Sequence, residues 1–276
     1  MQLIKSPLNY TGGKFKLLPQ ILPFFPKQID IFVDLFGGGA NVSINVEANQ
    51  IVYNDTLIQV VDFLKTCKEE PLENNLNDIK NLCSAFSLSK ENAEGYKSLR
   101  DNYNFGSKYP MLFYTLVCHS FNNQIRFNKK GEFNLPFGKR YFGSELESKF
   151  CEFVKHIKNK NISFSNKDFR KLDLNKLNNN SFVYADPPYL ISTATYNEQD
   201  GWNEKDELDL LNILDNINSR NIKFALSNVI KNKGFENKIL KEWSKKYDVN
   251  ILQKDYKNSN YQRVKDDITI EVLITN

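Results

Sequence analysis

The tetrapeptide Asp186-Pro187-Pro188-Tyr189 has the residue types that could activate a weakly nucleophilic amine. The exocyclic amine of adenine reacts poorly because its lone pair is delocalised into the ring. The carboxylate of Asp186 and the carbonyl of Pro187 could each accept one amine hydrogen, which would prepare the nitrogen for in-line attack on a methyl sulfonium. The prolines hold the carbonyls rigid, and Tyr189 offers a ring on which a flipped base can stack. The alternative interpretation is an Asp-Pro turn without chemistry.

A second candidate site combines the glycine turn Gly37-Gly38-Gly39 with Asp55. The run 29–36 is apolar and β-branched, which predicts a buried strand that ends at these glycines. Since glycine has no side chain, the backbone can pass close to a ligand at the start of a following helix, which we expect at 40–48. A second strand at 51–55 ends in Asp55, whose carboxylate could accept hydrogen bonds from both ribose hydroxyls of a nucleoside cofactor. A turn that binds no ligand is the alternative for the glycines alone.

The elements that must position these residues follow an α/β pattern. A strand predicted at 181–185 leads into Asp186, and ligands of open α/β sheets bind at the carboxyl ends of strands. Asn203 can cap a helix, and strands are predicted at 222–226 and 268–274. The apolar face of that helix is predicted to consist of Leu208, Leu211, Leu214 and Ile217. The stretch 57–165 shows helical patches, as at 57–65, without a rhythm of parallel strands, so the α/β fold is interrupted by an insertion.

Composition narrows the class of protein. The 276 residues are 41% hydrophobic and 25% charged, which is typical of one large α/β domain or of one such domain with an insertion. Two histidines and four cysteines without a C-x-x-C pair predict no metal site, and the cysteines are expected to be free thiols. These residues are His119, His156, Cys67, Cys83, Cys118 and Cys151. No apolar run approaches a membrane span and no signal core follows Met1, so we expect a soluble, cytoplasmic protein.

The formal charge of +4 is too mild to indicate nucleic-acid binding by itself, but basic residues gather between 125 and 140. Five basic residues face one acid, Glu132, in this segment, and aromatic residues lie between the charges. The basic residues are Arg126, Lys129, Lys130, Lys139 and Arg140, and the aromatic ones are Phe127, Phe133, Phe137 and Tyr141. The sequence Lys129-Lys130-Gly131 predicts a hairpin tip, and a two-stranded ribbon can enter the major groove of DNA. A solvated basic hairpin is the alternative.

Over nearly its whole length the chain resembles the Dam-type DNA adenine-N6 methyltransferases. The resemblance rests on Asn9-Tyr-Thr-Gly-Gly-Lys14, Asp34-Leu-Phe-Gly-Gly-Gly39, Tyr53-Asn-Asp55, Phe121-Asn-Asn-Gln-Ile-Arg-Phe-Asn128, Gly131-Glu-Phe-Asn-Leu-Pro-Phe-Gly138 and Asp186-Pro-Pro-Tyr189. It implies a doubly wound, Rossmann-like methyltransferase sheet formed by 1–56 and 166–276. It also implies that 57–165 is an inserted, mostly helical target-recognition domain that carries a β-hairpin.

The resemblance implies S-adenosylmethionine as cofactor and double-stranded DNA as substrate, with a flipped target adenine. It assigns catalysis to Asp186, Pro187 and Tyr189. It assigns cofactor binding to Tyr10, Lys14, Asp34, Phe36, Gly37, Gly39, Asp55 and Asp186. It assigns DNA binding to Asn9, Phe121, Asn122, Gln124, Arg126, Asn128, Lys129, Lys130, Pro136, Lys139 and Arg140. Phe121 and Asn122 match positions that disturb the target base pair, Arg126 one that reads a guanine, and Pro136 one that touches a base edge. No metal is required, because the sulfonium already activates its methyl group.

Family members with a similar Arg126 segment methylate GATC, which is therefore the expected target. Asn9 departs from the lysine that several members carry to help read the first base, and residue types vary at the position of Gln124. Neither departure affects the expected reaction. We expect a monomer, and any partner restriction endonuclease would be a separate chain because no nuclease segment is visible.

Two other classes of function stay open at this stage. An enzyme of the same chemistry could act on RNA adenine or on a protein glutamine. Asp186 counts against glutamine, because free-standing glutamine methylation usually goes with Asn at that position, and a hairpin suited to a B-form major groove counts against duplex RNA. A catalytically inactive DNA-binding protein is the other alternative, and the intact Lys14, Asp55 and Asp186 count against it.

Overall fold

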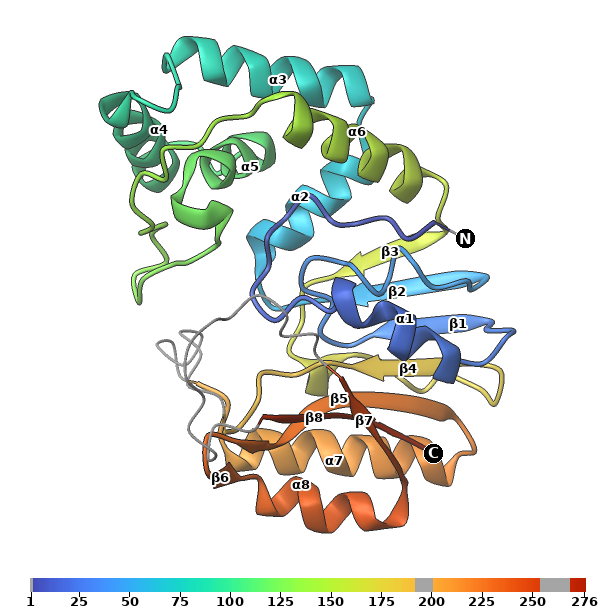
Figure 1. The fold of residues 1–276 in the computed structure, drawn as a ribbon. Helices are drawn as coiled ribbons and strands as arrows, with labels where there is room; N and C mark the ends of the chain where they lie inside the picture. The colour runs from blue at the N-terminus through green and yellow to red at the C-terminus, as the bar shows by residue number, and fades with distance from the viewer. Residues whose placement is uncertain (1, 192–200, 254–268) are drawn as a thin grey trace. The chain divides into compact units, whose positions relative to one another are not determined.

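A computed structural model describes residues 2–191, 201–253 and 269–276 (Figure 1). The described residues divide into two compact units. The first is drawn from 1–13, 38–45 and 55–166, and the second from 14–37, 46–54 and 167–276. The chain passes between the units close to the boundaries expected near 56 and 166, but two segments expected with the sheet, 1–13 and 38–45, belong to the first unit.

The N-terminal segment joins the first unit because two asparagines beyond the glycine turn bind its backbone. Asn45 accepts a hydrogen bond from the N–H of Ile4 at 2.8 Å and donates one to the Ile4 carbonyl at 2.7 Å. Asn41 accepts a hydrogen bond from the N–H of Ser6 at 3.0 Å. These contacts are buried, and the two asparagine side chains therefore satisfy main-chain groups that water cannot reach.

The helix predicted at 40–48 is wrong, because these residues form a series of turns. Ala40 adopts a left-handed φ of 62°, which is incompatible with continued right-handed helix. The Asn45 amide also donates to the Asn41 carbonyl at 2.8 Å. Asparagine side chains that bond to nearby backbone compete with helical hydrogen bonds, and here they hold the chain in turns.

The first unit is mostly helical, as the sequence predicted for the insertion. Its elements are α2 (Ile58–Glu69), α3 (Leu72–Ala85), α4 (Ala93–Phe105), α5 (Pro110–His119), η3 (Phe121–Asn123), α6 (Ser144–Lys158) and β3 (Ile162–Ser165). Every residue of α5 from Met111 to His119 is buried, so this helix is the core around which the others pack. Tyr114 of α5 stacks on both Phe63 of α2 and Phe150 of α6, with ring centroids 4.8 and 5.1 Å away.

The second unit is built on a mostly parallel sheet in the order β2-β1-β4-β5-β8-β7, to which β6 adds by pairing with β5. Its strands are β1 (Ile31–Asp34), β2 (Gln50–Asn54), β4 (Phe182–Ala185), β5 (Lys223–Asn232), β6 (Phe235–Glu236), β7 (Asp248–Leu252) and β8 (Ile270–Thr275). The pairs among β2, β1, β4 and β5 are parallel, whereas β8 pairs antiparallel with β5 and β7. All five predicted strands form, although Ile268 lies outside the described residues.

The remaining helices of the second unit are short, apart from α7. They are η1 (Phe15–Leu17), α1 (Leu18–Ile21), η2 (Leu22–Phe24), η4 (Phe169–Lys171), α7 (Glu204–Ser219), α8 (Lys238–Trp243) and η6 (Ser244–Lys246). Figure 1 shows α7 and α8 beside β5, where both pack.

The two faces of the sheet follow from side-chain alternation along its strands. Phe32 of β1 and Phe182 and Tyr184 of β4 point to the face covered by Phe25, whose ring lies 4.6–5.8 Å from theirs. Their neighbours Val33 and Val183 belong to the apolar cluster on the α7 side. Both faces are therefore buried, as a parallel sheet requires.

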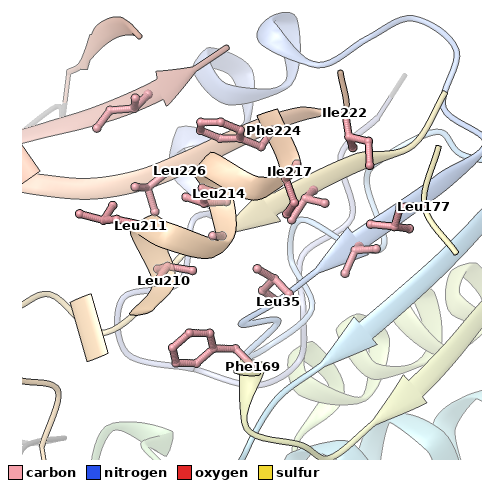
Figure 2. Close-up of a cluster of buried hydrophobic side chains, with 14 of the residues drawn as sticks. Leu35, Phe169, Leu177, Leu210, Leu211, Leu214, Ile217, Ile222, Phe224 and Leu226 are labelled. Carbon is pink, nitrogen blue, oxygen red and sulfur yellow. The ribbon is translucent and has the colours of Figure 1, made fainter. Parts of the chain in front are cut away.

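The helix α7 confirms the predicted cap at Asn203, which forms a reciprocal capping box with Asp206. Its apolar face differs from the prediction at one position, because Leu208 is 47% exposed. The residues of α7 that face the sheet are Leu210, Leu211, Leu214 and Ile217. They form one apolar cluster with Leu35, which follows β1, and with Phe224 and Leu226 of β5 (Figure 2). No helix within the described part of the chain is long and apolar enough to cross a membrane.

Candidate active site and nucleic-acid interface

Asp186 is the first residue beyond β4, a strand that lies between β1 and β5. The parallel register of these strands puts Asp186 at the carboxyl edge of the sheet, as predicted. Pro187 is buried and Pro188 is exposed. The motif thus leaves the sheet directly after its most buried strand, with Asp186 and Tyr189 half-buried.

Lys14 pairs with Asp186. Its Nζ lies 2.7 Å from each carboxylate oxygen of Asp186. The lysine side chain is 4% exposed and the aspartate 16%. Because an unpaired ammonium would be strongly disfavoured at this burial, the pair fixes both side chains at the end of β4. The fold brings together Lys14, predicted as a cofactor residue, and Asp186, predicted as both a catalytic and a cofactor residue.

Tyr189 and Glu271 complete this cluster. The Tyr189 hydroxyl lies 3.1 Å from Oδ1 of Asp186 and 3.1 Å from Oε1 of Glu271. Glu271, on β8, is 2% exposed and its Oε1 is 3.7 Å from Nζ of Lys14. The sequence analysis missed Glu271, although a single carboxylate inside the apolar strand predicted at 268–274 was a usable signal.

The electrostatics of the cluster follow from burial and from two neighbouring carboxylates. Burial raises the pKa of Asp186, the ammonium of Lys14 opposes that rise, and the charge of Glu271 adds to it. Burial also raises the pKa of Tyr189, which both carboxylates raise further. Tyr189 is therefore a neutral hydroxyl donor, and the proton affinity of Asp186 depends on its three charged or polar neighbours.

The second unit also carries the first half of the glycine turn. Asp34, the last residue of β1, is buried. A Cβ on Gly37 would lie 2.1 Å from the ring of Tyr53, so only glycine fits there. Phe36 packs against Phe169 and Trp202, with ring centroids 5.3 and 5.6 Å away.

The first unit carries the other half of the turn together with Tyr10 and Asp55. Asp55 is buried, and its carboxylate accepts hydrogen bonds from the N–H groups of Gly38 and Leu57, each at 2.8 Å. Burial raises the pKa of Asp55, while these N–H groups lower it. Gly38 has φ +48°, and a Cβ added to Gly38 would lie 3.0 Å from the Tyr10 ring. A Cβ added to Gly39 would lie 3.2 Å from the Cβ of Tyr10. Tyr10 thus lies beside Gly38 and Gly39, and Gly38 is hydrogen-bonded to Asp55.

The predicted basic hairpin forms in the first unit. Phe127 and Phe133 make an antiparallel bridge, and the N–H of Gly131 donates to the Asn128 carbonyl at 2.9 Å to close the turn. Gly131 has φ +75°, which favours glycine. Lys129 and Lys130 are exposed at the tip, as are Lys139, Arg140 and Pro136 further along. The Asn128 side chain accepts the N–H groups of Lys130 and Glu132, at 2.9 and 3.0 Å, so it stabilises the turn.

Arg126 is held by the opposite arm of the hairpin. Its Nε donates to Oδ1 of Asn134 at 2.8 Å, and its Nη2 donates to the Asn134 carbonyl at 3.1 Å. One side of the guanidinium is therefore oriented by Asn134. The sequence analysis did not single out Asn134, whose role depends on a cross-strand register that only the folded hairpin defines.

Phe121, 50% exposed, projects from a tight turn in the first unit. Asn122 and Asn123 both have left-handed φ, 54° and 53°, which is uncommon for consecutive residues other than glycine. The Asn123 amide holds the turn through the Cys118 carbonyl at 2.7 Å, and the Asn9 amide does so through the Asn122 carbonyl at 2.8 Å. Arg140 reaches Oδ1 of Asn122 at 3.3 Å. Asn9 and Arg140 thus both contact Asn122, the residue that follows Phe121.

The segment 131–138 supports this turn. The N–H of Phe121 donates to the Pro136 carbonyl at 3.0 Å, and the N–H of Gly138 donates to the His119 carbonyl at 2.9 Å. A Cβ on Gly138 would lie 2.1 Å from the Ser120 carbonyl oxygen. Gln124 is close by in the chain, and its N–H donates to the Phe121 carbonyl at 3.2 Å. Residues 131–138 therefore stabilise the turn at Phe121 through their backbone, in addition to presenting exposed side chains.

The aromatic residues of the basic segment divide between core and surface. Phe133 is 1% exposed and packs against Tyr103, Phe113 and Phe127. Phe137 packs on Tyr96. Three of the four aromatic residues that lie among the basic ones, Phe127, Phe133 and Phe137, thus pack against other rings of the first unit. Among the described residues no cluster of His, Cys, Asp or Glu could hold a metal.

Comparison with known proteins identifies the family. The sequence model described as "D12 class N6 adenine-specific DNA methyltransferase" matches residues 10–260, which include both glycine segments and Asp186-Pro-Pro-Tyr189. The chain belongs to this D12 class. The family that the sequence motifs indicated is thereby confirmed, and the mostly parallel sheet of the second unit fits the D12 methyltransferase fold.

Named relatives of this D12 chain include modification enzymes. It is 47% identical to the type II methyltransferase M.FokI of Planomicrobium okeanokoites and 41% identical to the modification methylase StsI of Streptococcus sanguinis, in each case over 99% of this chain and 43% of the relative. It is 28% identical to the DNA adenine methylase of Serratia marcescens over 71% of both chains. The chain thus spans less than half the length of the first two relatives.

Proposed function

We propose that this chain transfers a methyl group from S-adenosylmethionine to N6 of an adenine in double-stranded DNA. The observation that carries the proposal is the buried Lys14–Asp186–Tyr189 cluster directly after β4, in a chain of the D12 class. The Asp-Pro-Pro-Tyr sequence alone predicted the acceptor groups, and the fold adds the ammonium that stabilises the carboxylate.

The chemistry of the chain's own residues follows from their acceptor capacity. Asp186 accepts one hydrogen of the target amine and the Pro187 carbonyl accepts the other, which orients the nitrogen lone pair. Before the amine binds, Lys14 stabilises the charge of Asp186 and so opposes the rise in its pKa that burial causes. Tyr189 offers its ring to a base turned out of the helix. S-adenosylmethionine supplies the electrophilic methyl group when bound.

The hydrogen-bond acceptors of Asp55 in the first unit fit the ribose of a nucleoside cofactor. The Asp55 carboxylate accepts hydrogen bonds from the backbone N–H groups of Gly38, Thr56 and Leu57, and a carboxylate has about four acceptor sites. Asp55 therefore retains acceptor sites for ribose hydroxyls while its position is fixed by backbone. Tyr10 and Gly39, which lie beside it, are proposed to contact the cofactor as well. In the second unit Asp34, Phe36, Gly37 and Lys14 are proposed to do so.

The first unit is proposed to recognise DNA. Exposed Lys129, Lys130, Lys139 and Arg140 fit contacts to phosphates, which add affinity and salt dependence without reading sequence. Arg126 is proposed to read guanine with the end of its guanidinium, because Asn134 holds the Nε side. Phe121, on its braced turn, is proposed to disturb the target base pair, with Asn122, Gln124, Asn128, Asn9 and Pro136 near the bases.

The recognition sequence is proposed to be a short site that contains adenine. GATC is the site implied by the Dam-type resemblance, whereas the relatives with higher identity are modification methylases. We further propose that methylation protects DNA from a separately encoded restriction endonuclease, as the names of these relatives suggest.

The proposal is tested by transfer of labelled methyl groups to duplex DNA, followed by mapping of the modified bases. Label on N6 of adenine within one short sequence is the expected result. Label on cytosine, on RNA only, or on no nucleic acid would contradict the proposed activity. Duplexes substituted one position at a time then decide whether the site is GATC.

A further inference from the structure

Glu271 is the buried carboxylate of the active-site cluster that the proposed reaction does not use. It lies in β8, between apolar residues, and it is 2% exposed. A buried carboxylate away from polar partners is strongly disfavoured, so its retention inside an apolar strand needs a local reason.

The neighbours of Glu271 are the neighbours of Asp186. Its Oε1 is 3.1 Å from the Tyr189 hydroxyl, which is also 3.1 Å from Asp186, and 3.7 Å from Nζ of Lys14. Lys14 and Tyr189 therefore each face two carboxylates. A short displacement would pass the ammonium from one carboxylate to the other.

This arrangement bears on how Asp186 can receive the amine. Lys14 approaches both oxygens of Asp186 at 2.7 Å, and Tyr189 approaches one of them. A carboxylate that is already hydrogen-bonded by an ammonium and a hydroxyl has less acceptor capacity for a further N–H. Asp186 can accept the amine hydrogen more strongly if these donors have another acceptor.

We propose that Glu271 is a positioning residue that takes up the Lys14 ammonium and the Tyr189 hydroxyl while Asp186 accepts the hydrogen of the target amine. The inference rests on the proposed function, because it assigns a role in that reaction. The titratable groups that act on Asp186 are Lys14, Tyr189 and Glu271, and the charges of Asp186, Asp34 and Glu271 all act on Tyr184.

The sign of the pH effect follows from these contacts. Asp186 must be ionised to accept a hydrogen, so turnover falls as pH falls through its pKa. Glu271 raises the pKa of Asp186, and the Tyr189 hydrogen bond lowers it. Glu271→Gln should therefore move the acid-side midpoint of the rate to lower pH, whereas Tyr189→Phe should move it to higher pH.

The experiment measures single-turnover methylation of duplex DNA against pH for the wild type and the Glu271→Gln variant, with cofactor affinity by calorimetry. We expect a rate lowered about tenfold or more, because a positioned group is lost, with cofactor affinity within about twofold. The acid-side midpoint should move to lower pH. An unmoved midpoint overturns the proposal, whether or not the rate falls.

Matched variants separate positioning from a general loss of buried charge. Glu207→Gln removes another fully buried carboxylate of the second unit, bonded to Trp202, Asn228 and Asn237, and should keep the wild-type midpoint. The same shift in Glu207→Gln overturns the proposal. Where Glu271→Gln does not fold, Glu271→Asp keeps the negative charge but, with a side chain one methylene shorter, moves the carboxylate away from Lys14 and Tyr189. A wild-type rate in that variant also overturns the proposal, and a loss of about fivefold or more supports it.

The outcome distinguishes the two proposals. A wild type that methylates adenine, with variants that fail these expectations, removes the role of Glu271 and leaves the proposed function intact. A wild type that transfers no methyl group to DNA removes both.

Discussion

Lys14 and Asp186 lie 172 positions apart in the chain, yet the ammonium of one is 2.7 Å from both carboxylate oxygens of the other. The pair joins the segment before η1 to the segment after β4 at the carboxyl edge of the sheet. The ion pair is nearly buried, so removing Lys14 leaves the Asp186 carboxylate without its counter-charge, whereas removing Asp186 leaves Lys14 with Glu271 at 3.7 Å.

Asp186→Ala should lower turnover by 10²-fold or more, since it removes a polar group that acts on the reacting amine. DNA affinity should be largely spared, because the exposed basic residues proposed to contact phosphates, such as Lys129 and Lys139, lie in the other unit. Single-turnover methylation and a gel-shift titration measure the two effects. Near-normal turnover in the purified variant would remove Asp186 from the mechanism.

Asp55→Ala should weaken S-adenosylmethionine binding through two lost charge-assisted hydrogen bonds, each on the order of 1.5–3 kcal/mol. It should also lower the melting temperature, because the N–H groups of Gly38 and Leu57 lose their acceptor. Calorimetry measures the cofactor affinity, with the exposed Asp248→Ala as the control. An unchanged affinity would exclude Asp55 from the cofactor site.

Cofactor affinity should depend on pH in a direction set by Asp55. Burial raises the pKa of Asp55, and a protonated carboxyl loses acceptor capacity for the ribose hydroxyls. Affinity should therefore fall as pH is lowered, and the fall should begin at a higher pH than for an exposed aspartate. Calorimetric titrations across the acid range test this, and they should show a weaker pH dependence in Asp55→Ala.

Arg126→Ala should relax specificity at one base pair, since a guanidinium paired with guanine contributes about 1–3 kcal/mol of discrimination. Asn134→Ala should cause a smaller loss at the same base pair, because it frees the Nε side of Arg126. Lys129→Ala should weaken binding to all duplexes about equally and reduce its salt dependence. Methylation rates on singly substituted duplexes separate these outcomes. Equal slowing of every substrate by Arg126→Ala would make Arg126 a backbone contact.

Gly138→Ala should displace the turn that carries Phe121. The added Cβ would lie 2.1 Å from the Ser120 carbonyl oxygen and 2.7 Å from the Phe121 nitrogen, and backbone must move to relieve this. We expect slower methylation and less exposure of the target base, measured with a fluorescent base analogue in the duplex. Gly12→Ala is the contrasting control, because a Cβ there meets nothing within 4 Å, although its φ of +79° carries strain. Unchanged base exposure in Gly138→Ala would show that the turn has no part in base extrusion.

Features that depend on a few neighbouring residues were predictable from the sequence. The capping box at Asn203 forms within one helical turn, and the hairpin tip at Gly131 needs only its own glycine and Asn128. The strand that leads to Asp186 was predictable because all four of its residues are buried and none is charged, as in the near-continuous apolar runs of buried parallel strands. The hydrogen-bond acceptors of Asp-Pro-Pro-Tyr were likewise predictable, because the Asp186 carboxylate and the Pro187 carbonyl are adjacent in the chain.

Only the tertiary structure decided which distant groups meet. Glu271 became part of the cluster because β8 pairs with β5, and Asn134 orients Arg126 through the hairpin register. The turns at 40–45 replaced a predicted helix because Asn41 and Asn45 bind the N-terminal backbone, a partner absent from local sequence. Local patterns fix the backbone conformation that a segment favours, whereas burial and pairing free energies depend on segments that approach only when the chain has folded.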